Sequence, residues 1–125
     1  VYDTAWIDTP ITDGVYWHFW YVPSWWHSFR AGLTELAHGP NSAFVHELQT
    51  EPWGPVNNAF LSQEEANKSM PADKIRTMVE FTENTGMKEM YLWGGEWWYW
   101  QKTKGNFEPW RVVRELQVER QNNGH

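Results

Sequence analysis

Residues 43–49, AFVHELQ, decide the fold class. A short apolar run that becomes polar at its end is typical of a strand that is buried on both faces and whose carboxyl end opens onto a site. Residues 87–93, MKEMYLW, and residues 1–7, VYDTAWI, are rich in the same strand-forming side chains. The sequence therefore predicts three strands, with a long aromatic loop over residues 8–24 after the first of them.

Helical patterns follow each predicted strand. Apolar side chains at helical spacing predict one helix over about 24–38, which the Gly39-Pro40 pair ends. The same spacing predicts a helix over 109–121 near the end of the chain. The residues at this spacing are Trp26, Phe29, Leu33 and Leu36 in the first helix, and Trp110, Val113 and Leu116 on one face of the second.

A third helical region lies between the second and third strands. Ser62 and Glu65 form an S-x-x-E capping box, and we expect Pro71 to interrupt the helix that begins there. A second helical segment is expected to begin at Asp73 and to stop at Gly86. Its predicted buried stripe is Ile75, Met78, Val79 and Thr82.

Strand–helix units in series imply an α/β fold with parallel strands and right-handed crossovers. Three parallel strands alone leave two unpaired edges, whereas parallel sheets are normally covered on both faces. We therefore expect the chain either to pair with another copy or to be a piece of a larger α/β structure.

Composition excludes several classes of function. The chain has 125 residues, which is enough for one domain, and a net charge of -6 without a Lys/Arg cluster, so nucleic acid is not an expected partner. It has no cysteine, hence no disulfide or thiolate metal site, and no apolar run long enough for a transmembrane helix. It begins with valine and shows no signal peptide, which suggests a processed chain or one cut from a longer protein.

Aromatic residues are unusually frequent. Eleven tryptophans, five tyrosines and six phenylalanines make up 18% of the chain. They are typical either of a core built from large side chains or of platforms that stack on flat ligands, and the acidic charge favours sugars over bases as that ligand. The cluster Trp17, Trp20, Trp25 and Trp26 fits a sugar platform, a lid on the catalytic face or an interfacial membrane segment.

Carboxylates close to aromatic residues suggest cleavage of glycosidic bonds, which uses a pair of carboxyl groups. The candidates are Glu47, Glu51 and Glu96, with Asp3 and Asp8 as weaker ones. Glu47 stands where the apolar run of 43–49 becomes polar, the position at which barrel enzymes keep catalytic side chains. A solvated or salt-bridged glutamate is the alternative at each position.

Three blocks of sequence carry a resemblance to a known family. HELQTEPWGP (46–55), LSQEEANKSM (61–70) and FTENTGMKEMYLWGGEWWYW (81–100) resemble the C-terminal part of bacterial TIM-barrel glycoside hydrolases, the cellulase-like group in the clan of retaining (β/α)₈ enzymes. The resemblance implies that residues 1–125 are a single C-terminal segment holding strands 6–8 of the barrel with their helices. Because such a barrel takes about 250 residues, an N-terminal half-barrel or a second copy is the expected partner.

The resemblance also implies roles for particular residues. Glu47 would be the nucleophile, Tyr2 would donate a hydrogen bond to it, and Trp93 would form the floor of the sugar subsite. The acid/base of that clan lies in an Asn-Glu-Pro motif on strand 4, which this chain lacks. Thr50-Glu51-Pro52 is similar to that motif, but its place after strand 7 makes the similarity a coincidence under this interpretation.

Several further residues are candidates for contact with substrate. Glu96 would bind sugar hydroxyls or anchor its loop, and His46 would orient Glu47 or only pack. Trp53, Trp97 and Glu51 complete the predicted substrate-binding set. No metal or cofactor is expected, because the histidines lack ligand spacing. Asn67-Lys68-Ser69 matches a glycosylation sequon, a short pattern that often occurs by chance.

The expected function is retaining hydrolysis of a β-linked oligo- or polysaccharide, with the acid/base supplied from outside this chain. The alternative is a non-catalytic carbohydrate-binding or structural barrel fragment that self-associates or needs a partner chain. The sugar, its linkage and the cellular location are not predicted.

Overall fold

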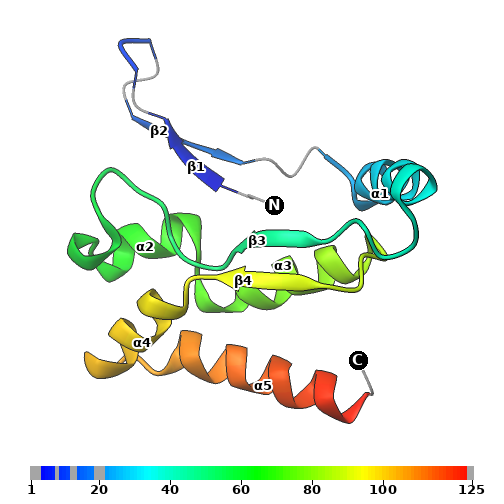
Figure 1. Ribbon diagram of the computed structural model, residues 1–125. Helices are drawn as coiled ribbons and strands as arrows, with labels where there is room; N and C mark the ends of the chain where they lie inside the picture. The colour runs from blue at the N-terminus through cyan, green and yellow to red at the C-terminus, as the bar shows by residue number, and fades with distance from the viewer. Residues whose placement is uncertain (1–3, 8, 12–13, 19–21, 124–125) are drawn as a thin grey trace.

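Two strands, β3 (Val45–Gln49) and β4 (Met90–Trp93), form a parallel pair at the centre of the fold, as the sequence predicts (Figure 1). The structure is a computed structural model that describes residues 4–7, 9–11, 14–18 and 22–123. It shows a mixed α/β fold with a small parallel sheet. The pairing register slips between Val45 and Leu48, where β3 carries a bulge.

A hairpin takes the place of the first parallel strand. β1 (Thr4–Ile7) pairs antiparallel with β2 (Val15–His18) in a sheet of its own. The prediction of three parallel strands is therefore wrong, as is the assignment of all of residues 8–24 to a loop. Val15, Tyr16 and Trp17 are β-branched or aromatic residues that favour strands, and exposed and half-buried side chains alternate along residues 15–18. The connection to β1 is short, which favours antiparallel pairing, because a parallel strand needs a longer crossover.

The helices follow the predicted order with small changes of boundary. Pro71, in an extended conformation, precedes α3, so Asp73 lies in its first turn and is not its cap. Residues 95–103 form a helix that the sequence analysis does not predict. The helices are α1 (Ser24–His38), α2 (Gln63–Ser69), α3 (Ala72–Glu83), α4 (Gly95–Thr103) and α5 (Glu108–Asn122), with a short 3₁₀ helix, η1 (Asn58–Phe60).

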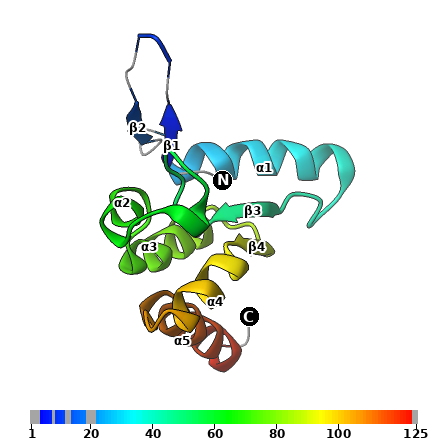
Figure 2. The same ribbon diagram turned by 90° about the vertical axis from the view of Figure 1, so that its left-hand side faces the viewer.

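The core lies on one face of the parallel sheet. Helix α3 packs on β3 and α5, and α5 also packs on α4, on the side of the sheet opposite α1 and the hairpin (Figures 1 and 2). The predicted buried stripe of α3 is confirmed, and Val113 and Leu116 of α5 are buried as well. The buried apolar cluster is Val45, Leu48, Ala66, Met70, Ile75, Met78, Val79, Trp97, Trp98, Val112, Val113 and Leu116.

The other face of the sheet is open among the residues that the structure describes. Phe44, His46 and Tyr91 are exposed there and their rings are near neighbours, so the prediction that residues 43–49 are buried on both faces is wrong. Helix α1 has the predicted bounds but contains no buried residue. Its apolar stripe, Trp26, Phe29, Leu33 and Leu36, is exposed.

A tyrosine holds the hairpin to the rest of the fold. The hydroxyl of Tyr16 donates a 2.6 Å hydrogen bond to Oε1 of Glu65, and Lys68 pairs with the other oxygen. Burial, followed by the Glu65 carboxylate, raises the pKa of Tyr16. The N–H of Glu65 donates to Ser62, so this half of the predicted capping box is confirmed, while the Glu65 side chain turns to the hairpin.

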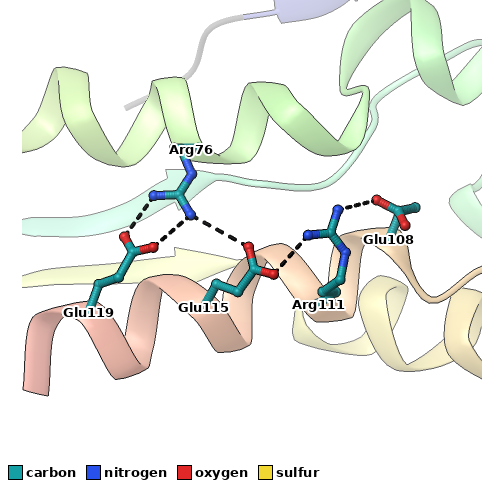
Figure 3. Close-up of polar contacts among 5 residues, drawn as sticks. All are labelled: Arg76, Glu108, Arg111, Glu115 and Glu119. Atoms are coloured by element: carbon teal, nitrogen blue, oxygen red, sulfur yellow. Dashed lines mark hydrogen bonds and ion pairs between the residues drawn. The ribbon is translucent and has the colours of Figure 1, made fainter.

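An ion-pair chain joins α3 to α5 on the surface (Figure 3). Arg76 of α3 binds Glu119 through two hydrogen bonds and also reaches Glu115, which pairs with Arg111. The chain ends at Glu108, which Arg111 also binds. Hydrogen bonds from these arginines lower the pKa of Glu119 and of Glu108.

We predict that Leu48→Ala lowers the free energy of unfolding by about 2–5 kcal/mol, because Leu48 is fully buried between the sheet and the helices. Leu36→Ala is the matched control, since Leu36 on α1 is 86% exposed and its loss should change stability by less than about 0.5 kcal/mol. Urea unfolding followed by circular dichroism measures both. Equal losses would contradict the open face of α1.

We predict that Arg76→Gln lowers the melting temperature at neutral pH and that the difference from wild type shrinks in acid. The carboxylates that Arg76 and Arg111 stabilise have lowered pKa values, so their contribution is present above the ordinary glutamate pKa of about 4.3 and is lost as pH falls below it. The effect should be small and weakened by salt, because the pairs are exposed.

Arg114→Gln on α5 is the matched control for this ion-pair chain. Arg114 is exposed, and no ion pair joins it to another residue in the described part of the chain. Its loss should leave the melting temperature unchanged at both pH values. A difference for Arg76→Gln that stays the same in acid would contradict the prediction.

Candidate functional site

The carboxyl ends of β3 and β4 are tied together by Thr50. Its N–H and its hydroxyl both donate to the carbonyl of Trp93, at 2.9 and 2.8 Å. Its own carbonyl accepts a 2.8 Å hydrogen bond from the indole of Trp98 in α4. Thr50 is fully buried, so these bonds fix the last residues of both strands and the start of α4 without competition from water.

Glu51 follows Thr50 at this end of the sheet. Its Oε1 accepts one hydrogen bond from the indole N–H of Trp93, at 3.0 Å, and another from that of Trp53, at 3.2 Å. The side-chain amide of Gln49, which is also fully buried, donates to the backbone carbonyl of Glu51. The Glu51 carboxylate is thus held by the loop after it and the end of β4, while the strand before it holds the Glu51 backbone.

Gly94 lets the turn into α4 pass close to Glu51. Its φ of 146° lies in a region that L-residues rarely adopt. A Cβ at this position would lie 2.9 Å from the carbonyl oxygen of Thr50 and 3.0 Å from Cβ of Glu51. Glycine is therefore required both by the backbone conformation and by the space that Glu51 occupies.

A partly open hollow of about 590 Å³ lies in front of this arrangement. Two carboxylates line it, Glu51 and Glu96, together with indole rings and two amide side chains. Trp93 is half exposed, which leaves its ring accessible to a ligand, whereas Trp97 is buried and its indole N–H has no partner in the described part of the chain. The complete lining is Glu51, Asn57, Asn58, Ala59, Leu92, Trp93, Gly94, Gly95, Glu96, Trp97 and Trp100.

Most of the predicted substrate-binding residues thus come together. Glu51, Trp93, Glu96 and Trp97 line one hollow, and Trp53 joins it through its hydrogen bond to Glu51. Trp100, Asn57 and Asn58 also line this hollow, and they were not predicted as site residues. Helical periodicity could have found Trp100, because it lies one turn after Glu96 in α4.

Glu47 lies elsewhere. It is in the middle of β3, so the prediction that it ends the strand is wrong, and Leu48 and Gln49 follow it within the strand. Its side chain is 34% exposed and lies 3.6 Å from Nδ1 of His46. Glu47 and His46 line a second hollow of about 580 Å³ between β3 and α1, which shares no lining residue with the first.

The second hollow has a different chemical character. His27 and Arg30 of α1 line it with Phe44 and Met87. Burial against its surroundings, followed by the positive charge of Arg30, lowers the pKa of His27, whose ring contacts Phe81 edge to face. Tyr2, the predicted partner of Glu47, lies outside the residues that the structure describes, so its role stays a prediction.

We predict that Gly94→Ala destabilises the fold more than Gly105→Ala. Both glycines have positive φ, at 146° and 87°, so both variants bear a conformational penalty of about 1–2 kcal/mol. Only Gly94 would also press a Cβ against Thr50 and Glu51, because the space around Gly105 is open. Urea unfolding compares the two variants. Equal losses would contradict the close approach of the turn to Glu51.

Within the described residues, no group of three or more histidine, aspartate or glutamate side chains is placed to hold a metal ion. No helix in that part of the chain is both long enough and apolar enough to cross a membrane. No family model, no curated protein and no solved structure matches the chain. The structure shows a mixed α/β fold with a small parallel sheet. At the carboxyl end of this sheet lies a hollow that is lined by carboxylates and indole rings.

Proposed function

We propose that the chain is the C-terminal part of a TIM-barrel glycoside hydrolase and that it handles a β-linked carbohydrate in the hollow at the carboxyl ends of β3 and β4. The observation that carries the proposal is the Glu51 carboxylate, held by two indole N–H groups beside the half-exposed ring of Trp93. Sites of barrel enzymes lie at the carboxyl ends of the strands, which is where this carboxylate lies.

The arrangement of layers supports the barrel. Helices α3 and α5 cover one face of the β3–β4 pair, as outer helices cover a barrel, while Phe44, His46 and Tyr91 lie exposed on the other face, which would be the inner one. The exposed apolar stripe of α1 is a second surface that a further polypeptide would cover. An N-terminal half-barrel or a second copy of the chain is the proposed occupant.

The proposed chemistry is a double displacement. A carboxylate oxygen attacks the anomeric carbon while an acid outside this chain gives its proton to the leaving glycosidic oxygen, and water then releases the sugar from the ester. The half-exposed ring of Trp93 offers an apolar face to the sugar, and the amides of Asn57 and Asn58 and the carboxylate of Glu96 are suited to its hydroxyl groups.

Glu51 is better placed than Glu47 for this role. It lies at the end of β3 in the same hollow as Trp93, whereas Glu47 lies in mid-strand in a hollow without tryptophan. The role of Glu47 as nucleophile stays a prediction that the paired variants below decide. Trp53, which is bound to Glu51, would act with the carboxylate and Trp97 would form the inner wall.

We predict that Glu51→Gln lowers kcat on an activated aryl β-glycoside on the order of a thousand-fold or more in the barrel that contains this chain, because the amide cannot form the ester. Glu47→Gln, the matched control on the same strand, should stay within about threefold of wild type. A second measurement uses the 125-residue chain alone. Calorimetry measures its binding of soluble β-1,4- and β-1,3-linked glucose oligosaccharides.

The outcomes separate the candidate functions. Loss of hydrolysis in Glu47→Gln alone would return the nucleophile to Glu47. Binding that Trp93→Ala weakens about tenfold, together with no turnover in any form, would favour the non-catalytic carbohydrate-binding fragment. If the protein neither binds nor hydrolyses any β-linked sugar, both proposals are excluded.

A further inference from the structure

We propose that Trp53 and Trp93 are positioning residues that hold Oε1 of Glu51 with their indole N–H groups and so leave Oε2 as the single oxygen that meets a ligand. The two hydrogen bonds measure 3.2 and 3.0 Å and reach the same oxygen from different elements, the loop after β3 and the end of β4. Only the last step, in which Oε2 meets a sugar, rests on the proposed function.

The backbones of both tryptophans are held by hydrogen bonds. The backbone N–H of Trp53 donates to the hydroxyl of Ser69, which is fully buried in α2. Pro52, which precedes Trp53, is buried as well. The carbonyl of Trp93 accepts both hydrogen bonds from Thr50. Since each donor is anchored through its backbone, the pair forms a preorganised clamp and not a chance contact between mobile side chains.

The chemistry of the indole group determines which oxygen of the Glu51 carboxylate is left for a ligand. An indole N–H is a donor only, and a carboxylate oxygen offers two lone-pair positions, so the two tryptophans occupy both acceptor positions of Oε1. Among the residues that the structure describes, no hydrogen-bond donor reaches Oε2. Glu51 lines the hollow and is only partly buried, so Oε2 is the oxygen left for a ligand.

The same constraint fixes the place of a proton. When Glu51 is protonated, Oε1 must keep its lone pairs for the two N–H donors, so the proton resides on Oε2. The clamp thus presents Oε2 to the hollow as a nucleophile when the group is ionised and as a proton donor when it is neutral. Either role of a glycosidase carboxylate is served by this one geometry.

Trp93 links the clamp to the sugar floor. Its ring is half exposed in the hollow while its N–H is bound to Glu51, so a sugar stacked on that ring touches the residue that positions the carboxylate. Trp53 holds the same oxygen from outside the lining of the hollow. Removing the N–H of Trp53 should therefore change how Glu51 is oriented without changing the surface on which a sugar rests.

The clamp is tested without any ligand by ¹H–¹⁵N spectra of the indole groups of the 125-residue chain over an acid titration. Trp53→Phe and Trp93→Phe each remove one signal and so assign the two. We expect both signals to move with one shared midpoint as Glu51 is protonated, and to stop moving in Glu51→Gln. Trp98, whose indole binds the Thr50 carbonyl, is the internal reference. Different midpoints, or movement that persists in Glu51→Gln, would overturn the proposal.

A kinetic measurement tests the step that rests on the proposed function. In the barrel that contains this chain, Trp53→Phe should lower kcat about tenfold and leave KM unchanged, because the ring is kept and the sugar surface is not altered. Trp110→Phe, outside the hollow, is the matched control. A rise in KM with unchanged kcat would overturn the positioning role, while absence of hydrolysis in wild type would refute the proposed function and leave the spectroscopic result standing.

Discussion

The hydrogen bonds of Thr50 are the constraint on which the rest of the site depends. The backbone N–H and the hydroxyl of Thr50 donate to the carbonyl of Trp93, and the backbone carbonyl of Thr50 accepts from the indole of Trp98, so two strands and a helix meet at a single buried residue. The bulge in β3 and the glycine at position 94 are both compatible with the hydrogen bonds of Thr50. The bulge shifts the strand before Thr50, and Gly94 lets the chain turn into α4 without displacing Glu51.

The fold is asymmetric about its sheet. On one side, buried apolar side chains from β3, α3, α4 and α5 form a continuous core, which supplies the hydrophobic stabilisation that a small domain needs. On the other side, rings from the sheet and the stripe of α1 stay in contact with water. Exposed apolar area of this extent marks surfaces that bind other polypeptides or ligands. The proposed barrel explains both faces with one architecture.

Local patterns predicted the regular elements well, because helix α1 and the stripe of α3 depend on periodicity and on stop signals that the sequence carries. The position of Glu51, the carboxylate that the two indole groups hold, could not be predicted in the same way. Gln49 and Thr50 are polar, and the polar end of the predicted strand 43–49 suggested a site at Glu47. They are in fact fully buried, because each satisfies its side chain on backbone carbonyl groups, a pairing that depends on tertiary structure. The hairpin was missed because residues 8–24 were predicted to be one loop, although residues 15–18 are rich in strand-forming side chains.

The hydroxyl of Ser69 that anchors Trp53 has a consequence for modification of the chain. Asn67, Lys68 and Ser69 match the glycosylation sequon, yet they lie within a helix, and Ser69 is fully buried with its oxygen bound to the Trp53 N–H. An enzyme that attaches a glycan must reach the hydroxyl of the third residue as well as the asparagine amide. In the folded protein the Ser69 hydroxyl is enclosed while the Asn67 side chain is exposed, so the folded chain presents only part of the sequon at its surface.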